Sequence, residues 1–179
     1  MTTLTIKGHH IKNTHVRDSF NRRAVQFANK IIGSLGTLGL TEDDIDIPIE
    51  AMANKKAPAF VSWYFEGYHL HYSYSACSKY VENLSIVGQV VEKEVQALAE
   101  GKKTIEEFIS DFAEDSDIKK QREDARTLLG VPPDSTDVAL IDKKYKILAK
   151  GCHPDTPSGD HEKFKAINNA HKILKRELG

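Results

Sequence analysis

The sequence predicts an α+β fold: a small antiparallel sheet with packed helices in the N-terminal part, followed by an all-α helical hairpin at the C-terminus. An aromatic-rich run split by the turn pair Glu66-Gly67 predicts the sheet, and apolar residues at every third or fourth position predict the helices. A length of 179 residues allows one medium domain or two small ones. We place a boundary in a polar stretch, which gives expected domains at 1–115 and 116–179.

The composition is that of a soluble globular protein, since 40% of the residues are hydrophobic and 28% are charged. The net charge of −1 creates no global field that would attract nucleic acid or an anionic membrane. No apolar stretch approaches the roughly twenty residues that span a bilayer, and the polar N-terminus lacks a signal-peptide pattern. Having only Cys77 and Cys152 fits a reducing compartment. We therefore expect a cytoplasmic protein that does not bind membranes.

The N-terminal part begins with an expected strand over residues 3–7, where β-forming and apolar residues alternate. Apolar residues at steps of three and four then predict a helix over 14–35, with Thr14 as its N-cap. Alternating isoleucines predict a short strand over 45–49, which Pro48 confines to a sheet edge.

The clearest hairpin signal lies at residues 59–76, where two aromatic-rich runs flank Glu66-Gly67. Apolar residues at helical spacing follow over residues 77–99. Thr104 is expected to cap a shorter helix after that. Together these elements make a small sheet covered by helices.

The histidines of the hairpin allow two interpretations. His69 and His71 point to the same strand face, because alternate residues of a strand do so, and together they could bind zinc. They could instead line the polar face of the hairpin. We favour the polar face and predict no metal site, because no Asp or Glu is interleaved with them in a ligand motif.

The aromatic residues of the hairpin also allow two interpretations. They could stack on the bases of single-stranded nucleic acid, with basic residues of the first helix at the phosphates. They could instead form core or a client-binding surface, which we favour because this part of the chain is net acidic. The residues concerned are Trp63, Tyr64, Phe65, Tyr68, Tyr72 and Tyr74, with Arg17, Arg22, Arg23 and Lys30.

Three helical patterns follow the boundary. The first ends after Leu128 and Leu129, which are expected to face inward. The second runs over residues 137–150 with Ser135 or Asp137 as its cap, and the third runs over residues 160–175. The apolar stripes of the second and third helices predict a helical hairpin.

The second helix and the loop after it carry the most distinctive residues of the chain. Lysines repeat on one helix face at steps of three and four, and the loop displays a His-Pro-Asp tripeptide. Pro154 cannot continue a helix and restricts the residue before it. The residues of this candidate contact surface are Lys143, Lys146, Lys150, His153, Pro154 and Asp155.

These segments resemble the J domain of DnaJ-type co-chaperones. The resemblance is carried by "LLGV", "KKYKILAKGCHPD" and "EKFKAINNAHKIL", over roughly residues 124–177. The tripeptide alone is a weak signal, but a basic amphipathic helix before it and an F-x-x-I-x-x-A helix after it make the match specific. The resemblance implies that the second helix and the His-Pro-Asp loop dock on a DnaK-type ATPase of the heat-shock chaperone class and stimulate it.

The resemblance also implies a chain that is not an enzyme and needs no cofactor, with the N-terminal domain giving client, location or oligomer contacts. A second hypothesis is a nucleic-acid-binding or interaction module with a degenerate J-like tail. The sequence departs from the family pattern at His171, where a tyrosine is usual, and at Asp142 and Ile147, where basic residues are common. A catalytic His153–Asp155 pair is disfavoured because no nucleophile converges on it, and Cys152 is expected to be a buried structural thiol.

Overall fold

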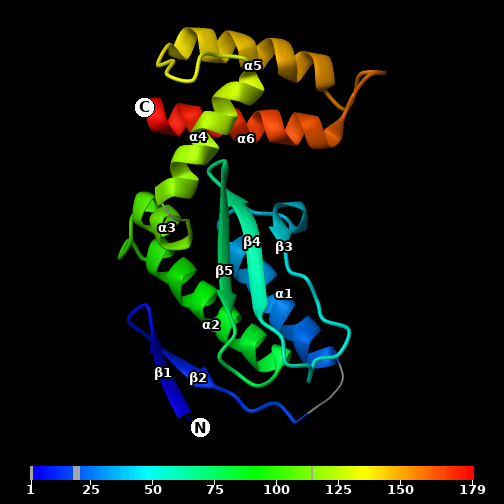
Figure 1. Cartoon of the computed structure of the whole chain (residues 1–179), viewed down its shortest axis with the longest axis vertical. Helices are drawn as coiled ribbons and strands as arrows, with labels where there is room; N and C mark the ends of the chain where they lie inside the picture. Colours follow the sequence, from blue (N-terminus) through cyan, green and yellow to red (C-terminus); the bar gives the residue numbers. More distant parts are fainter. Residues whose placement is uncertain (1, 18–20, 114) are drawn as a thin grey trace. The chain divides into compact units, whose positions relative to one another are not determined.

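The chain forms two compact units, shown in the computed structural model of Figure 1. The structure describes residues 2–17, 21–113 and 115–179. Unit 1 comprises Met1–Trp63 and Leu70–Phe112, and unit 2 comprises Tyr64–His69 and Ala113–Gly179. The predicted α+β class is confirmed: small antiparallel sheets with helices precede a helical C-terminal part.

Unit 1 is built on two small antiparallel sheets, one formed by β1 and β2 and the other ordered β3-β4-β5. The tip of the β4–β5 hairpin, residues 64–69, belongs to unit 2. The elements are β1 (Thr2–Ile6), β2 (His9–Asn13), α1 (Arg22–Gly36), the 3-10 turn η1 (Glu42–Asp44), β3 (Ile45–Asp46), β4 (Ala59–Phe65), β5 (Tyr68–Tyr74), α2 (Tyr80–Ala99) and α3 (Ile105–Phe112).

The hairpin predicted around Glu66-Gly67 is confirmed. Both turn residues have positive φ, 52° at Glu66 and 84° at Gly67, which is the type I′ conformation that suits a two-residue hairpin. One face of the hairpin is buried and the other is largely exposed, as the alternation of burial along β5 shows. Trp63 and Leu70 lie on the buried face, and His71 lies on the exposed one.

Helices α1 and α2 pack on each other and lie on one side of the β3-β4-β5 sheet (Figure 1). A Cβ atom at Gly88 of α2 would lie 3.4 Å from Ile31 Cγ1 of α1, which is van der Waals contact, so the two helices meet at this residue. Aromatic rings fill the space between the sheet and α3: the ring centroids of Trp63 and Phe112 lie 4.9 Å apart, and Phe108 is fully buried.

The N-terminal segment differs from the expectation in two ways. Thr14 does not cap α1, which begins at Arg22 after Asn21. Val16 lies outside the helix: its N–H donates to the buried Glu82 carboxylate at 3.1 Å and its carbonyl accepts from Lys79 Nζ at 2.8 Å. The strand β2 was missed, because its "HHIKN" sequence carries a single large apolar residue, the fully buried Ile11.

Other expected elements agree more closely with the structure. The strand expected at residues 45–49 is shortened to β3, which pairs antiparallel with β4 at the sheet edge. Thr104 caps α3 as expected: Glu107 N donates to Thr104 Oγ1 at 3.1 Å, and Thr104 N donates to the Glu107 carboxylate at 2.7 Å. Of the basic residues proposed for a nucleic-acid surface, Arg22, Arg23 and Lys30 lie on α1.

Unit 2 contains the helices α4 (Asp115–Leu129), α5 (Val138–Cys152) and α6 (His161–Leu178). Helix α6 packs on both α4 and α5, so it forms the centre of this unit. The polar stretch in which we place the domain boundary is helical, since it forms the first turns of α4. None of the helices in the described ranges is both long and apolar enough to cross a membrane.

Candidate partner-binding site at the His-Pro-Asp loop

Helices α5 and α6 form the predicted helical hairpin, and an aspartate begins each helix. Asp137 accepts from Leu140 N at 3.1 Å and Asp160 accepts from Lys163 N at 3.1 Å. Each carboxylate accepts from an N–H of the first turn that has no partner within the helix, and its negative charge interacts favourably with the positive end of the helix dipole. Asp137 therefore fills the cap position for which Ser135 was the alternative, and the two caps fix the ends of the loop between the helices.

The loop that carries the tripeptide is held by its own backbone. His153 has φ −57° and ψ 135°, the extended conformation that a following proline requires. Its carbonyl accepts from Thr156 N at 3.0 Å and from Thr156 Oγ1 at 2.7 Å. A Cβ atom at Gly159 would lie 2.4 Å from this same carbonyl oxygen, so the loop closes only with glycine at that position. Asp160 N then donates to Cys152 O at 3.1 Å and joins the two ends of the loop.

The side chains of the tripeptide face solvent from this fixed loop. The Asp155 side chain is 90% exposed and that of His153 is 46% exposed. The His153 ring packs edge-on against Phe164 of α6, with centroids 5.1 Å apart. Asp155 N donates to His153 Nδ1 at 3.2 Å, which makes Nδ1 an acceptor and leaves Nε2 as the donor of a neutral ring. The loop therefore presents an imidazole and a carboxylate to solvent, with His153 Nδ1 and Asp155 Oδ2 3.5 Å apart.

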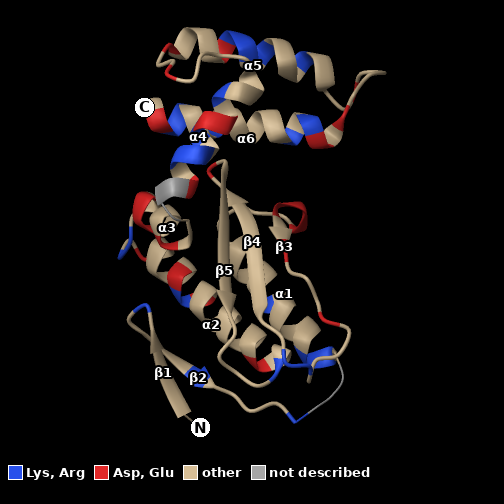
Figure 2. Ribbon diagram, in the orientation of Figure 1, with Lys and Arg blue, Asp and Glu red and all other residues tan. Residues whose placement is uncertain are grey.

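The lysines expected on one face of α5 are exposed. Lys143, Lys146 and Lys150 all lie on the solvent side of the helix, and Figure 2 shows basic residues spaced along it. Ile147 stands between them with 60% of its surface exposed, although it is a large apolar residue. No ion pair is found for Lys143 or Lys150 within the part of the chain that the structure describes. This face of α5 is therefore basic with one apolar residue in its middle.

Two departures from the family pattern contact each other. His171 Nε2 of α6 lies 2.7 Å from Asp142 Oδ1 of α5, and the hydrogen bond lowers the pKa of this carboxyl. The His171 ring also stacks on Tyr145, with centroids 3.9 Å apart and planes inclined by 8°. Tyr145 in turn donates its hydroxyl to Asn168 Oδ1 at 2.7 Å. Asp142 and His171 thus form a pair that joins the two helices of the hairpin.

A chemical role for the neighbouring groups finds no geometric support. Cys152 is buried with 5% of its surface exposed, and its thiol lies 3.0 Å from Leu148 O, so it is the structural thiol expected from the sequence. Within the described residues, no three His, Cys, Asp or Glu side chains converge as metal ligands would. His71 contacts Ser62 Oγ at 3.1 Å through Nδ1, and the His69 ring lies against Tyr64 with centroids 5.1 Å apart and planes inclined by 53°.

Three of the six aromatic residues that could form a stacking surface are buried and not available for it. Trp63, Phe65 and Tyr68 are 1%, 7% and 2% exposed, so they belong to the interior. Tyr64 is 38% exposed and lies on the open face of the hairpin. This distribution follows the strand alternation and fits the interpretation of these aromatic residues as core.

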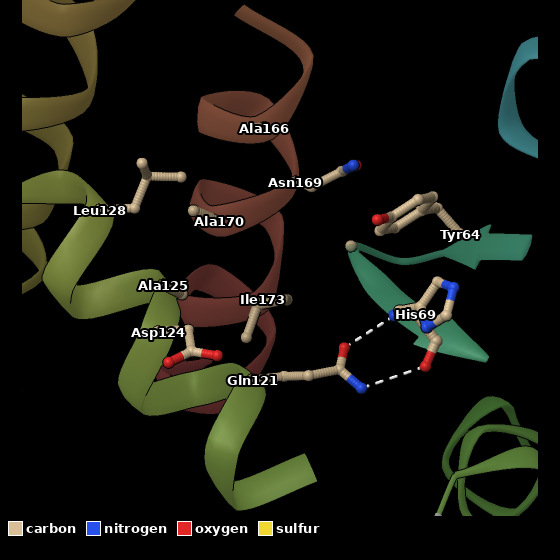
Figure 3. A pocket seen from close by; sticks show the side chains of 11 residues that line it. Tyr64, His69, Gln121, Asp124, Ala125, Leu128, Ala166, Asn169, Ala170 and Ile173 are labelled. Carbon is tan, nitrogen blue, oxygen red and sulfur yellow. Dashed lines mark hydrogen bonds between the residues drawn. The ribbon is translucent and has the colours of Figure 1, made fainter. Parts of the chain in front are cut away.

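The tip of the β4–β5 hairpin contributes a part of unit 2 that the sequence did not predict. Gln121 of α4 binds both backbone groups of His69: its Oε1 accepts from His69 N at 2.7 Å and its Nε2 donates to His69 O at 3.0 Å (Figure 3). Arg122 donates to the Tyr68 hydroxyl at 3.0 Å. A Cβ atom at Gly67 would lie 2.4 Å from Asn169 O of α6, so the turn rests directly on the helix backbone.

An open cavity of about 250 Å³ lies among the tip, α4 and α6 (Figure 3). Leu128 lines it and is 42% exposed, so the expectation that Leu128 faces inward was wrong, whereas Leu129 is buried as expected. The two leucines are neighbours on a helix and point about 100° apart, so they cannot both face one core.

A buried arginine fastens the loop between α4 and α5. Arg126 is 5% exposed, and its Nε donates to Ser135 O at 3.1 Å. Its Nη2 lies 3.0 Å from Glu177 Oε2 of α6, an ion pair without hydrogen-bond geometry. The pairing joins α4, the loop and α6 and was not predictable from helical spacing, because its partners lie far apart in the sequence.

A helical hairpin with an exposed His-Pro-Asp loop is the arrangement expected of a J domain, and the comparisons with known proteins agree. Residues 124–178 match the family model of the DnaJ domain. The chain is 47% identical over 55 residues to Protein SIS1 of Saccharomyces cerevisiae, a match that covers 28% of this chain and 15% of that protein. No solved structure matches the chain significantly.

Two bacterial relatives, both named Chaperone protein DnaJ, match the same part of the chain. The protein of Synechococcus elongatus is 44% identical over 54 residues, covering 28% of this chain and 18% of its own length. The protein of Caldicellulosiruptor bescii is 42% identical over 57 residues, covering 30% of this chain and 14% of its own length. The chain thus spans less than a fifth of each relative's length. The resemblance of the C-terminal segment to a J domain is therefore confirmed for residues 124–178.

Proposed function

We propose that this J domain recruits a DnaK-type chaperone and stimulates its ATPase, while unit 1 supplies client, location or oligomer contacts. The observation that carries the proposal is the His-Pro-Asp loop, which is fixed by backbone hydrogen bonds yet exposes His153 and Asp155. A loop with a fixed backbone loses little conformational entropy when it binds a partner. The exposed groups are therefore arranged for contact with another protein.

The chemistry of the site suggests how each part would contribute. Lys143, Lys146 and Lys150 provide a positive face that would steer association with an acidic surface. Among the described residues, His153 is the one basic side chain paired with the Asp155 carboxylate, which would accept a charge-assisted hydrogen bond from an arginine of the partner. The site would act by binding the hydrolysing state of the chaperone more tightly than its other states.

The test of the tripeptide is steady-state ATP hydrolysis by a DnaK-type chaperone in the presence of the full chain. We expect wild type to stimulate hydrolysis and His153→Gln to lose the stimulation. His161→Gln is the matched control, because His161 is exposed at the first residue of α6 and its change should leave stimulation intact. Equal stimulation by wild type and His153→Gln, or none by wild type, would overturn the proposal.

The lysine face has a separate test. Lys143→Glu combined with Lys146→Glu should slow association with the chaperone, and the difference from wild type should shrink as salt screens the charges. Lys119→Glu combined with Lys172→Glu, at exposed positions on α4 and α6, gives the same change in net charge and is the control. An association rate that falls equally in the control would show that net charge, and not this face, guides binding.

A further inference from the structure

Strand β5 has an open edge. It stands at the end of the sheet order β3-β4-β5, and among the described residues no strand pairs with its other side. His71 and Ser73 are both exposed along this edge. An unpaired edge is a row of backbone donors and acceptors and serves as a template for another extended chain.

The backbone groups that point outward can be identified from the turn. A two-residue hairpin turn places Phe65 and Tyr68 opposite each other as a hydrogen-bonded pair, and paired residues then alternate between bonded and non-bonded. The side chains of Ser62 and His71 meet at 3.1 Å, which fits this register. The N–H and C=O of His71 and Ser73, like those of His69, therefore point away from β4.

Gln121 shows directly that the backbone of His69 points outward. Its amide accepts from His69 N and donates to His69 O, at 2.7 and 3.0 Å (Figure 3). This is the same pair of hydrogen bonds that a neighbouring strand would make. Gln89 of α2 binds both backbone groups of Lys12 in β2 in the same way, at 2.9 and 2.8 Å. The next two outward positions of β5, at His71 and Ser73, have no such cover among the described residues.

We propose that the edge of β5 at His71 and Ser73 binds an extended peptide segment by strand addition, and that the occupant is an unfolded stretch of a client protein. The exposed residues of this edge carry no Asp, Glu, Lys or Arg, so an uncharged segment rich in β-branched residues fits it. Main-chain hydrogen bonds would supply affinity with little demand on sequence. The β1–β2 pair also has open edges, but a two-stranded sheet is a weaker template than this three-stranded one.

A second copy of the chain is a less suitable occupant. Two outward residues offer about four backbone hydrogen bonds, whereas a stable interface buries about 800 Å² on each partner. The edge is therefore long enough for transient capture of a peptide and too short for a lasting dimer. The inference rests on the client-binding role proposed for unit 1, but its test contains no chaperone, so either idea can fail without the other.

The first test uses fluorescence anisotropy of the full chain with a labelled, end-capped heptapeptide of alternating Thr and Val. The comparison peptide has the same sequence with N-methyl groups on alternate residues, which removes the donors of one edge. We expect the unmodified peptide to bind at least tenfold more tightly. Equal binding of the two peptides, or no binding of either, would overturn strand addition.

The second test changes the protein. Ser73→Pro removes an N–H that points away from β4, so the hairpin retains its own hydrogen bonds. Ser73→Ala keeps the N–H and is the control. We expect Ser73→Pro to weaken peptide binding at least tenfold and Ser73→Ala by less than twofold. If Ser73→Pro fails to fold, the two peptides still decide the question on wild type. A dimer in sedimentation that Ser73→Pro abolishes would overturn the proposed occupant in favour of a second copy.

Discussion

The hairpins β1–β2 and β4–β5 turn through nearly the same backbone conformation in different surroundings. The φ angles are 50° and 79° at Lys7 and Gly8, and 52° and 84° at Glu66 and Gly67. A Cβ atom at Gly8 would meet nothing within 4 Å, whereas at Gly67 it would lie 2.4 Å from a backbone oxygen of α6. Local sequence selects the turn in both cases, and only tertiary contacts decide what a substitution there would cost.

The two hairpins are also held in different places. The tip of β4–β5 is fixed at its turn by groups of α4 and α6. The β1–β2 hairpin is held by side chains: His9 Nε2 of β2 lies 2.6 Å from the buried carboxylate of Glu94, and Lys7 of the turn donates to Asp111 O at 2.9 Å. Lys103 also pairs with Glu94 and with Asp111. The β1–β2 turn is thus bound through a long side chain, whereas the β4–β5 turn lies directly against a helix backbone.

The largest expected effect comes from exchanging the two glycines for alanine. Gly67→Ala should destabilise unit 2 by more than about 3 kcal/mol, because it adds a clash with the backbone of α6 to the strain of positive φ. Gly8→Ala carries the strain alone and should cost about 1 kcal/mol. Chemical denaturation gives the two values, and hydrogen exchange should show lost protection in α6 for Gly67→Ala only. Equal costs would show that the tip does not rest on α6.

The second largest effect on stability is expected for the buried carboxylate of Glu94 in unit 1. Glu94→Ala removes the carboxylate that His9 contacts and one of the two carboxylates that bind Lys103, and should cost about 2 kcal/mol in unfolding free energy. Burial lowers the pKa of Lys103, but its bonds to Asp111 and Glu94 prevail and raise it, so this contribution is complete below the unfolded pKa and is lost as pH rises through the folded one. Glu92→Ala on the exposed side of α2 is the control, and a cost equal to that control would contradict a structural role of the network.

The two glutamines that bind strand backbones give a smaller, matched pair of effects. Gln121→Ala and Gln89→Ala each remove the two hydrogen bonds to the backbone of a strand residue, His69 or Lys12, and should each cost about 1 kcal/mol. Gln121→Glu keeps the acceptor for His69 N but loses the donor, so its cost should lie between wild type and alanine. Denaturation measures all three. If Gln121→Ala left the free energy of unfolding unchanged, water would be replacing the amide at no cost in stability.

The smallest effect concerns the exposed pair between α5 and α6. The hydrogen bond from His171 lowers the pKa of Asp142, so the contribution of this carboxylate is complete above its unfolded pKa and is lost as pH falls through the folded value. A carboxyl titration by NMR should therefore give Asp142 a midpoint below its ordinary value, and His171→Phe should return the midpoint upward. An unchanged midpoint in His171→Phe would show that the pair does not form in solution.

The parts of the structure that sequence predicted depend on local patterns. Periodic apolar residues and a proline determined α5 and its loop, and the Glu66-Gly67 pair determined the hairpin. What was missed depends on contacts between distant residues. Val16 lies outside the predicted helix with its backbone bound by Glu82 and Lys79, and Gly67 needs to be glycine because of α6.

The candidate site shows the same division. The exposure of His153 and Asp155 could be expected from the loop sequence, because Pro154 directs the chain out of the helix. The contact of His171 with Asp142 could not, since each residue alone only departs from the family pattern. The two residues are 29 positions apart in the chain, so the sequence alone does not reveal that they form a complementary pair.

The most direct test of the division of labour between the two surfaces is one ATPase experiment with the full chain. Hydrolysis by a DnaK-type chaperone is measured with wild type, His153→Gln and Ser73→Pro, without and with the Thr-Val peptide. We predict that His153→Gln fails to stimulate hydrolysis with or without the peptide. Without peptide, Ser73→Pro should stimulate hydrolysis as wild type does, and it should lose only the change in hydrolysis rate that the peptide produces with wild type. The account would be contradicted if Ser73→Pro failed to stimulate hydrolysis without peptide, or if His153→Gln still stimulated it.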